Sequence, residues 1–319
     1  MPESPRSTHG YILLGSGAVC PGRLAFVGLV THVPARASQL MDVDVERKCG
    51  ALKKGRRVAY EELKARQSVM WGVGPYQRIT ETTTDIHEKV IDRLAPEPGE
   101  RWLDLACGTG AVAERAAALG ADVTGVDLAP ALIETATKRA AELDLDIDYR
   151  VADCEQLEVP DASFDVVSST CGVMFAPDHA ATARELGRVM KKDGRLGLAN
   201  WTPTGGLAKM FKMMAPFQPA PSPSSPFDWG DPSVVADLLG ETFDLSVEED
   251  TSTLTLDSGE TYWKLFSTSY GPTKTLAHSL GDRREELHRA WVDFFETNYR
   301  ANGEIVHPRE YLLVLGRRR

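Results

Sequence analysis

The stretch LDLACGTG, residues 103–110, has the pattern of a buried strand that runs directly into a glycine-rich turn. The apolar residues before the turn suit the interior of a sheet. Gly108 and Gly110 permit positive φ angles and let a ligand approach the backbone closely. A strand that ends in such a turn and continues into a helix typically opens a doubly wound α/β fold. We therefore compare the rest of the chain with that fold.

Strands and helices alternate on the C-terminal side of this turn. Pro130 suits the first turn of a helix, and Asp178 suits an N-cap. Alternation at this spacing indicates βαβ units, right-handed crossovers and a parallel sheet. We expect strands at 101–105, 122–126, 147–151, 164–168 and 195–200, with helices at 110–119, 130–142 and 178–190. Outside this core we expect helices at 77–94, 232–239, 259–269 and 283–300, an amphipathic segment at 205–215, a strand near 244–256 and a last apolar strand.

Three aspartates stand at the ends of three successive predicted strands. Asp104 lies four residues before Gly108, Asp127 ends the second strand, and Asp153 follows the third. A carboxylate at Asp104 would repel a diphosphate and attract a cationic amine, although GTGAVA at 108–113 also fits a loose dinucleotide pattern. Asp127 can accept from both hydroxyls of a ribose, and Asp153 can accept from the exocyclic amine of adenine. Each acid alone could be a turn residue, but the three together favour a nucleoside that carries an amine.

Several motifs together resemble the class I S-adenosylmethionine-dependent methyltransferases. They are the turn LDLACGTG, GVDLAPALIETA (125–136), VADCEQLEVPDASFDVV (151–167) and LGRVMKKDGRLGLANW (186–201). The likeness is greatest to a bacterial small-molecule branch similar to the ubiquinone and menaquinone biosynthesis methyltransferases. It implies an α/β, Rossmann-like, doubly wound and mostly parallel sheet of seven strands, with an antiparallel last strand and helical cap elements. It also implies S-adenosyl-L-methionine as the cofactor.

The resemblance implies roles for individual residues. Asp104, Gly108 and Gly110 would hold the methionine end of the cofactor, and Asp127 would bind the ribose. Asp153 and Cys154 would meet the adenine. Trp71 and Tyr76 belong to the segment that closes over the cofactor, and residues 169–173 would line the methyl-transfer site. The remaining implied cofactor contacts are Ala106, Cys107, Leu128, Glu155, Ser169 and Thr170.

The chain divides at about residue 55. Residues 1–55 are rich in Gly, Pro, Ser and Arg without a sustained period, so we expect an extension with little fixed structure. Residues 56–319 would form the methyltransferase domain, with cap helices at 56–98, the cofactor-binding core at 99–201, a substrate-side loop and helices at 202–303, and the last strand at 304–319. The loop at 217–232 is either a linker or a lid, with Phe217, Phe227 and Trp229 over an apolar substrate.

Charge, apolar content and cysteine usage limit the classes of molecule that the chain can bind and the compartment it suits. The net charge is −10, and eleven of the basic residues fall within 1–69, so the remainder is strongly acidic and unsuited to a nucleic-acid backbone. No apolar run is long enough to span a bilayer. Five cysteines without a CxxC pair argue against a disulfide framework and a metal site, and favour the cytoplasm. We expect a small, apolar or aromatic acceptor.

One histidine is a candidate for catalysis. His179 follows FAPD near the expected methyl-transfer site and is the candidate general base, although a histidine at a helix N-terminus can also face solvent. Trp263 and Tyr270 are interpreted as core residues. Two alternatives remain open: an NAD(P)-dependent Rossmann oxidoreductase that uses the same turn, and a non-catalytic module that binds S-adenosylmethionine.

Overall fold

One mixed sheet organises the chain. The structure is a computed structural model that describes residues 60–218 and 224–319, so the extension expected at 1–55 lies outside the described residues. The described strands are β1 (Arg101–Leu105), β2 (Asp122–Asp127), β3 (Ile147–Val151), β4 (Phe164–Thr170), β5 (Met190–Trp201), β6 (Phe243–Leu256), β7 (Arg300–Ala301) and β8 (Glu304–Arg318). Seven of them follow the order β3-β2-β1-β4-β5-β8-β6, and β7 pairs with β8 at the side.

The strand directions match the predicted fold. The first five strands pair in parallel, and β8 inserts between β5 and β6 antiparallel to both. The Rossmann-like, doubly wound sheet with an antiparallel last strand is therefore confirmed. The centre of the sheet is shielded from solvent, because Trp102, Leu103 and Leu105 of β1 are fully buried. Burying large apolar side chains of this kind stabilises a fold by about 1.5–3 kcal/mol each.

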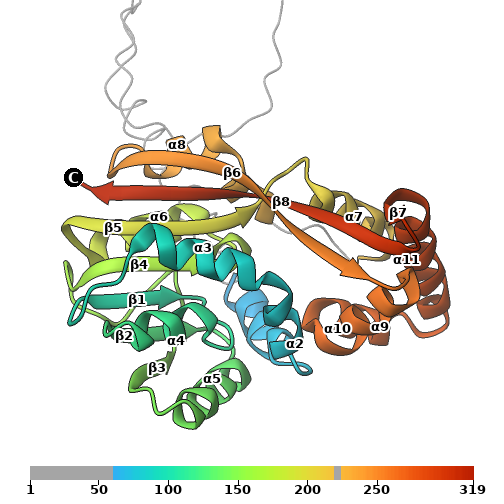
Figure 1. The fold of residues 1–319 in the computed structure, drawn as a ribbon, viewed down its shortest axis with the longest axis horizontal. Helices are drawn as coiled ribbons and strands as arrows, with labels where there is room; N and C mark the ends of the chain where they lie inside the picture. The colour runs from blue at the N-terminus through green and yellow to red at the C-terminus, as the bar shows by residue number, and fades with distance from the viewer. Residues whose placement is uncertain (1–59, 219–223) are drawn as a thin grey trace, which may run out of the picture. The chain divides into compact units, whose positions relative to one another are not determined.

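Helices cover the sheet and extend beyond it. Residues 60–71 are helical. The other described helical segments are α2 (Gln77–Thr80), η1 (Glu81–Thr83), α3 (Thr84–Leu94), α4 (Ala111–Ala118), α5 (Pro130–Glu142), η2 (Val173–Phe175), α6 (His179–Val189), α7 (Gly206–Met214), η3 (Ala215–Phe217), η4 (Pro226–Gly230), α8 (Pro232–Leu239), α9 (Gly259–Ser269), α10 (Gly271–Ser279), η5 (Gly281–Arg283) and α11 (Arg284–Tyr299). Figure 1 shows α3 and α4 crossing one face of the sheet, where α3 packs on β4 and β5.

Two expected elements differ in detail. The single helix predicted at 77–94 is divided into α2, η1 and α3, because Thr83 leaves the helical conformation with φ −127° and ψ 23°. Hydroxyl groups of this threonine-rich stretch bond to nearby carbonyls, which competes with regular helical pairing: Thr82 Oγ1 donates to Ile79 O at 2.8 Å and Thr83 Oγ1 to Thr80 O at 3.0 Å. The strand predicted at 195–200 begins earlier, at Met190, and includes Asp193 at φ 62°.

The ribbon formed by β6 and β8 is longer than the parallel core. These strands pair from Phe243 with Arg318 to Leu256 with Ile305, whereas β5 leaves β8 at the pair Trp201 and Tyr311. The ribbon therefore continues past the carboxyl ends of the parallel strands. Figure 1 shows this continuation running into the group formed by α7, α9, α10 and α11, and α7, α9 and α11 pack on it. The cavity described below lies at this edge of the sheet.

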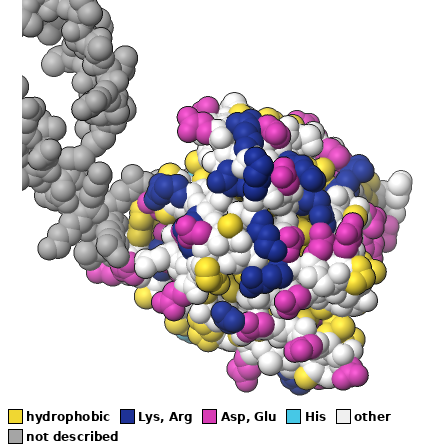
Figure 2. All heavy atoms as spheres, turned by 90° about the vertical axis from the view of Figure 1, so that its left-hand side faces the viewer, with side chains coloured by type: hydrophobic (Ala, Val, Ile, Leu, Met, Phe, Trp, Pro, Cys, Tyr) yellow, Lys and Arg dark blue, Asp and Glu magenta, His cyan; other side chains and the backbone are white. Residues whose placement is uncertain are grey.

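The opposite edge carries charge of both signs. Figure 2 views the side where the parallel strands begin, and basic and acidic side chains alternate across it. Many of them are paired: Arg195 meets Glu100 at 2.7 Å, and Lys191 meets Asp165 at 2.8 Å. Among the described helices, none combines the length and the apolar character that crossing a membrane requires.

Candidate active site

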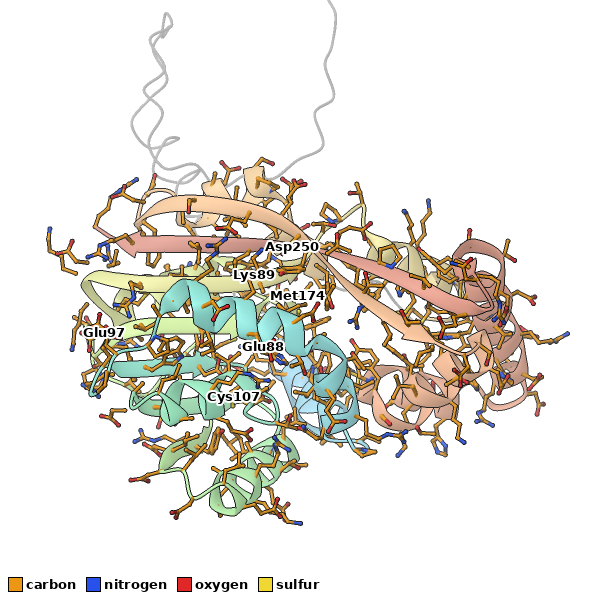
Figure 3. All side chains as sticks on the ribbon, in the orientation of Figure 1. Glu88, Lys89, Glu97, Cys107, Met174 and Asp250 are labelled. Atoms are coloured by element: carbon orange, nitrogen blue, oxygen red, sulfur yellow. The ribbon has the colours of Figure 1, made fainter. Side chains whose placement is uncertain are left out.

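The turn after β1 has an unusual backbone. Ala106, Gly108 and Gly110 all have positive φ angles, of 50°, 56° and 89°. Figure 3 shows Cys107 in this turn, between β1 and α4. The Gly110 amide donates to Cys107 O at 2.9 Å, which closes the turn. A Cβ on Gly110 would lie 2.1 Å from the Tyr149 hydroxyl, so any larger residue there would have to displace this side chain of β3.

Asp104 is a buried carboxyl group at the base of the turn. It is only 2% exposed. Its oxygens accept from Ser168 Oγ at 2.7 Å and from the Ala113 amide at 3.2 Å, and Ser168 in turn accepts from Trp102 Nε1 at 2.8 Å. Burial raises the pKa of Asp104 to about 7, although these hydrogen bonds favour the carboxylate. No cationic side chain of the described residues forms an ion pair with it.

Asp127 fixes the turn from the end of β2. One of its oxygens accepts from the Gly108 amide at 3.0 Å and the other from the Ala129 amide at 2.8 Å. Burial raises the pKa of this carboxyl group too. Each carboxylate oxygen has a second lone pair. Asp127 can therefore hold the turn in place and still accept hydrogen bonds from a ribose.

Asp153 is connected to the first described helix through a lysine that the sequence analysis missed. Lys64 Nζ lies 2.7 Å from Asp153 Oδ2 and also pairs with Glu155. Burial disfavours the Lys64 ammonium, but hydrogen bonds to the two carboxylates outweigh it and raise the pKa of Lys64. Asp153 Oδ1 accepts from the Glu155 amide at 2.9 Å. This ion pair holds the helix at 60–71 against the loop that follows β3.

A single cavity connects these residues. It encloses about 1340 Å³ of empty space, open solvent at its mouth included. Most of the predicted cofactor residues line it: Trp71, Tyr76, Asp104, Ala106, Cys107, Gly108, Asp127, Leu128, Asp153, Cys154 and Thr170. The structure therefore brings together residues that are up to 99 positions apart in the chain.

Three of the predicted cofactor residues do not line the cavity but hold the segments around it in place. Gly110 is the N-cap residue of α4. Glu155 pairs with Lys64 and accepts from the Asp178 amide at 2.6 Å. Ser169 Oγ donates to Leu105 O at 2.7 Å and accepts from the Val173 amide at 3.1 Å, which ties the ends of β1 and β4 together. None of the three is among the residues that line the cavity.

Aromatic rings cover the turn. A Cβ on Gly108 would lie 3.9 Å from Tyr76, so this ring lies over the glycine. Trp71 contacts Tyr76, Phe175 and Tyr270, with ring centroids 6.0, 4.8 and 5.6 Å apart. Tyr270, interpreted from the sequence as a core residue, lines the cavity as well. Trp263 is a core residue as expected, 4% exposed and outside the cavity lining.

The structure does not place the candidate base in the cavity. His179 is the first residue of α6, behind its N-cap Asp178, and it is not among the lining residues. Its Nδ1 lies 3.8 Å from Asp228, its ring contacts Trp229, and burial lowers its pKa. The aromatic residues proposed as a lid are also elsewhere: Trp229 is fully buried in the core, and neither Phe217 nor Phe227 lines the cavity. The tip of that loop, 219–223, lies outside the described residues.

The far end of the cavity was not anticipated. Thr82, Trp201, Phe266 and Arg309 line it beyond the carboxyl ends of β4 and β5. A sequence signal for Arg309 existed. Alternate residues of β8 are buried, and Arg309 is a charged residue at one of these inward-facing positions. Among the described residues, no group of three or more His, Cys, Asp or Glu is arranged to hold a metal ion.

Comparisons with known proteins agree with this geometry. Residues 103–198 match the family described as "Methyltransferase domain". An uncharacterized protein of Mycobacterium tuberculosis is 33% identical over 267 residues, which cover 81% of this chain and 96% of that protein. The ubiquinone biosynthesis O-methyltransferase of Xanthomonas axonopodis pv. citri is 40% identical over 119 residues, 36% of this chain and 49% of that enzyme.

A solved structure shares the fold. The YcgJ protein from Bacillus subtilis superposes with a TM-score of 0.53 and 21% identity, covering 73% of this chain and 97% of that one. Sheet order, turn and family match together define a methyltransferase. The chain belongs to the class I S-adenosylmethionine-dependent methyltransferases. S-adenosylmethionine is the cofactor of this family, and the resemblance inferred from the sequence is confirmed.

Proposed function

We propose that the chain transfers a methyl group from S-adenosylmethionine to a small, apolar or aromatic acceptor by in-line displacement. The observation that carries this proposal is the continuity of the cavity. It begins at three aspartates suited to the cofactor and continues into a space lined by Trp71, Phe175 and Tyr270. Donor and acceptor would then meet in one enclosed space, as a direct transfer requires.

The residues at the cofactor end fit the donor. Asp104 is a buried carboxylate without a cationic partner among the described residues, and a ligand ammonium would supply one. Asp127 ends the neighbouring strand β2, where the ribose would lie. Asp153 and Cys154 follow β3, the next strand of the sheet, where the adenine would lie. A dinucleotide fits less well, because its diphosphate would meet the Asp104 carboxylate in a dry site.

Positioning and exclusion of water would supply most of the acceleration. The bound cofactor supplies a methyl group on a positively charged sulfur, which is already activated. An acceptor lone pair forms the new bond to that carbon while the carbon–sulfur bond breaks and its electrons stay on sulfur. The aromatic rings of Tyr76 and Tyr270 would hold the acceptor in line and keep water out, and such alignment can contribute roughly 7–11 kcal/mol.

Calorimetric titration tests the cofactor assignment. The protein should bind S-adenosylmethionine and S-adenosylhomocysteine and should not bind NADH. Asp127→Ala should weaken cofactor binding while leaving the thermal unfolding transition cooperative. Binding of NADH with no binding of either sulfonium or thioether nucleoside would overturn the proposal in favour of an oxidoreductase.

Transfer itself needs a second measurement. Donor labelled on the methyl carbon is incubated with the protein and a mixture of cellular metabolites, and labelled products are identified by mass spectrometry. The expected result is labelled low-molecular-weight product that is lost in Asp127→Ala. Cofactor binding without any labelled product would favour the non-catalytic module. We also propose the cytoplasm as the compartment, because Cys107, Cys154 and Cys171 are all free thiols.

A further inference from the structure

Arg309 occupies an unusual position for a charged residue. It pairs with Ser252 in the β6–β8 ribbon, two residues before the point where Tyr311 meets the end of β5. It is therefore just beyond the carboxyl ends of the parallel strands, where ligands bind in open α/β sheets. It lines the cavity, yet its side chain is almost wholly buried at 2% exposure.

The guanidinium is held in place by uncharged groups. Nε donates to Ser252 O at 3.4 Å, Nη1 to Thr82 Oγ1 at 3.0 Å, and Nη2 to Ser252 Oγ at 2.8 Å and to Thr82 O. A guanidinium has five N–H donors, so one N–H on Nη1 has no acceptor among the described residues. The charged group also lies 5.7 Å from the ring of Trp201.

No carboxylate of the described residues forms an ion pair with Arg309. Asp85 reaches it only indirectly, by accepting from Ser252 Oγ at 3.0 Å. Asp250, on the same strand as Ser252, is engaged elsewhere: Figure 3 shows it beside Lys89 of α3, with which it forms an ion pair. It also accepts from the Tyr311 hydroxyl at 3.3 Å. A buried charge without a counter-ion costs several kcal/mol, which favours a ligand that supplies one.

The remaining titratable groups at this end of the cavity are neutral at pH 7. Burial lowers the pKa of His87 to about 3 and raises that of Cys171 to about 12. Burial also keeps the Tyr270 phenol protonated by raising its pKa. This end of the cavity therefore holds one positive charge that forms no ion pair with a described carboxylate and lies among aromatic and neutral surfaces, with Asp85 connected to it only through Ser252. Its complement is a largely apolar molecule with a single negative charge.

We propose that the methyl acceptor is a monoanion whose negative group pairs with Arg309. The inference rests on the proposed function, since it concerns the acceptor end of the same cavity. Two sources of the charge share this chemistry: a carboxylate that anchors the molecule, or an acidic phenol or enol that is itself the nucleophile. A single guanidinium with one free N–H suits one negative charge better than the double charge of a phosphate monoester.

Matched pairs of probes test the inference. The full chain, saturated with S-adenosylhomocysteine, is titrated calorimetrically at pH 8 with 4-hydroxybenzoate and its neutral twin 4-hydroxybenzamide. A second pair, 4-nitrophenolate and 4-nitroanisole, tests a charged nucleophile. We expect the anion of at least one pair to bind about tenfold or more tightly than its neutral twin, the gain expected from a hydrogen bond to a charged group. The pair that discriminates identifies the source of the charge.

Variants assign the preference to Arg309. Arg309→Gln should abolish the discrimination, Arg309→Lys should retain part of it, and Lys89→Gln, which removes a nearby cation already paired with Asp250, should leave it unchanged. Thermal unfolding and affinity for S-adenosylhomocysteine report whether each variant folds. If Arg309→Gln fails to fold, the comparison of anionic and neutral probes on the wild-type protein still tests the inference. Neutral twins that bind as tightly as the anions, no binding of either anion, or a preference that survives in Arg309→Gln would overturn the inference. Failure to bind S-adenosylhomocysteine would instead overturn the proposed function and this inference with it.

Discussion

The buried carboxyl group of Asp104 should make cofactor binding depend on pH. Its pKa in the free protein is raised to about 7 by burial, so half of the molecules carry the neutral acid at pH 7. An ammonium group of the ligand pairs with the carboxylate and not with the acid, so binding lowers this pKa and releases a proton. In the free protein the same shift makes the fold less stable as the pH rises from about 4 to 7, because the folded state keeps a proton that the unfolded chain has lost.

The magnitude follows from the ionised fraction. With a pKa of about 7, that fraction falls from one half at pH 7 to about one hundredth at pH 5. The dissociation constant for S-adenosylhomocysteine should therefore rise roughly 50-fold between pH 7 and pH 5, or about 2.3 kcal/mol. Titrations at pH 7 in buffers of different ionisation enthalpy should show the release of about half a proton per ligand bound.

Asp104→Asn is the matched variant. The amide oxygen can still accept from Ser168, so the core around Trp102 should remain intact while the titrating group is lost. We expect weaker binding at pH 7 and a much flatter pH dependence. If the variant followed the wild-type profile, the protonation of Asp104 would not control binding, and its assignment to the methionine end would be refuted.

Two further predictions concern the cap and the core. Lys64→Met removes the cation between Asp153 and Glu155, so the dissociation constant for S-adenosylmethionine should rise roughly threefold to tenfold. Lys64→Arg keeps the cation and should restore most of the affinity. If calorimetry gave equal affinities for the wild type and Lys64→Met, this ion pair would not support the site. Trp291→Ala empties the centre of an aromatic cluster with Tyr262, Phe266 and Phe295, and should cost about 3–5 kcal/mol in urea unfolding. Leu143→Ala, at an exposed position, should cost less than about 0.5 kcal/mol, and a similar loss in both variants would contradict the packing argument.

Local patterns were enough to predict the parallel core. β1 at 101–105 and α5 at 130–142 have the predicted bounds, because a short apolar run before a glycine turn and a helix opened by proline are strong local signals. α10 was not predicted, since Gly271 and Pro272 come one residue after the end of α9 and resemble a loop. The break at Thr83 was missed because it depends on hydroxyl groups that bond to the backbone.

The clustering of the three aspartates at one end of the cavity was predictable for the same reason. Asp104, Asp127 and Asp153 each end a strand that a local pattern can locate, and parallel pairing brings such ends together. Lys64 and Arg309 depend on contacts across 89 and 227 positions of the chain, which no local pattern contains. His179 was proposed for its nearness in sequence to the end of β4, but it is the first residue of α6 and does not line the cavity.

If Arg309 pairs with the acceptor as proposed, the register of β8 connects the fold with the choice of acceptor. Ile305, His307, Arg309 and Tyr311 are buried at alternate positions, so a single inserted residue upstream of Tyr311 would turn this set outward and bring Val306 and Glu310 inward. It would also replace a guanidinium by a carboxylate at the end of the cavity. Relatives that act on different acceptors should therefore differ by substitution at position 309 and its neighbours, while the spacing between this residue and the end of the sheet stays constant.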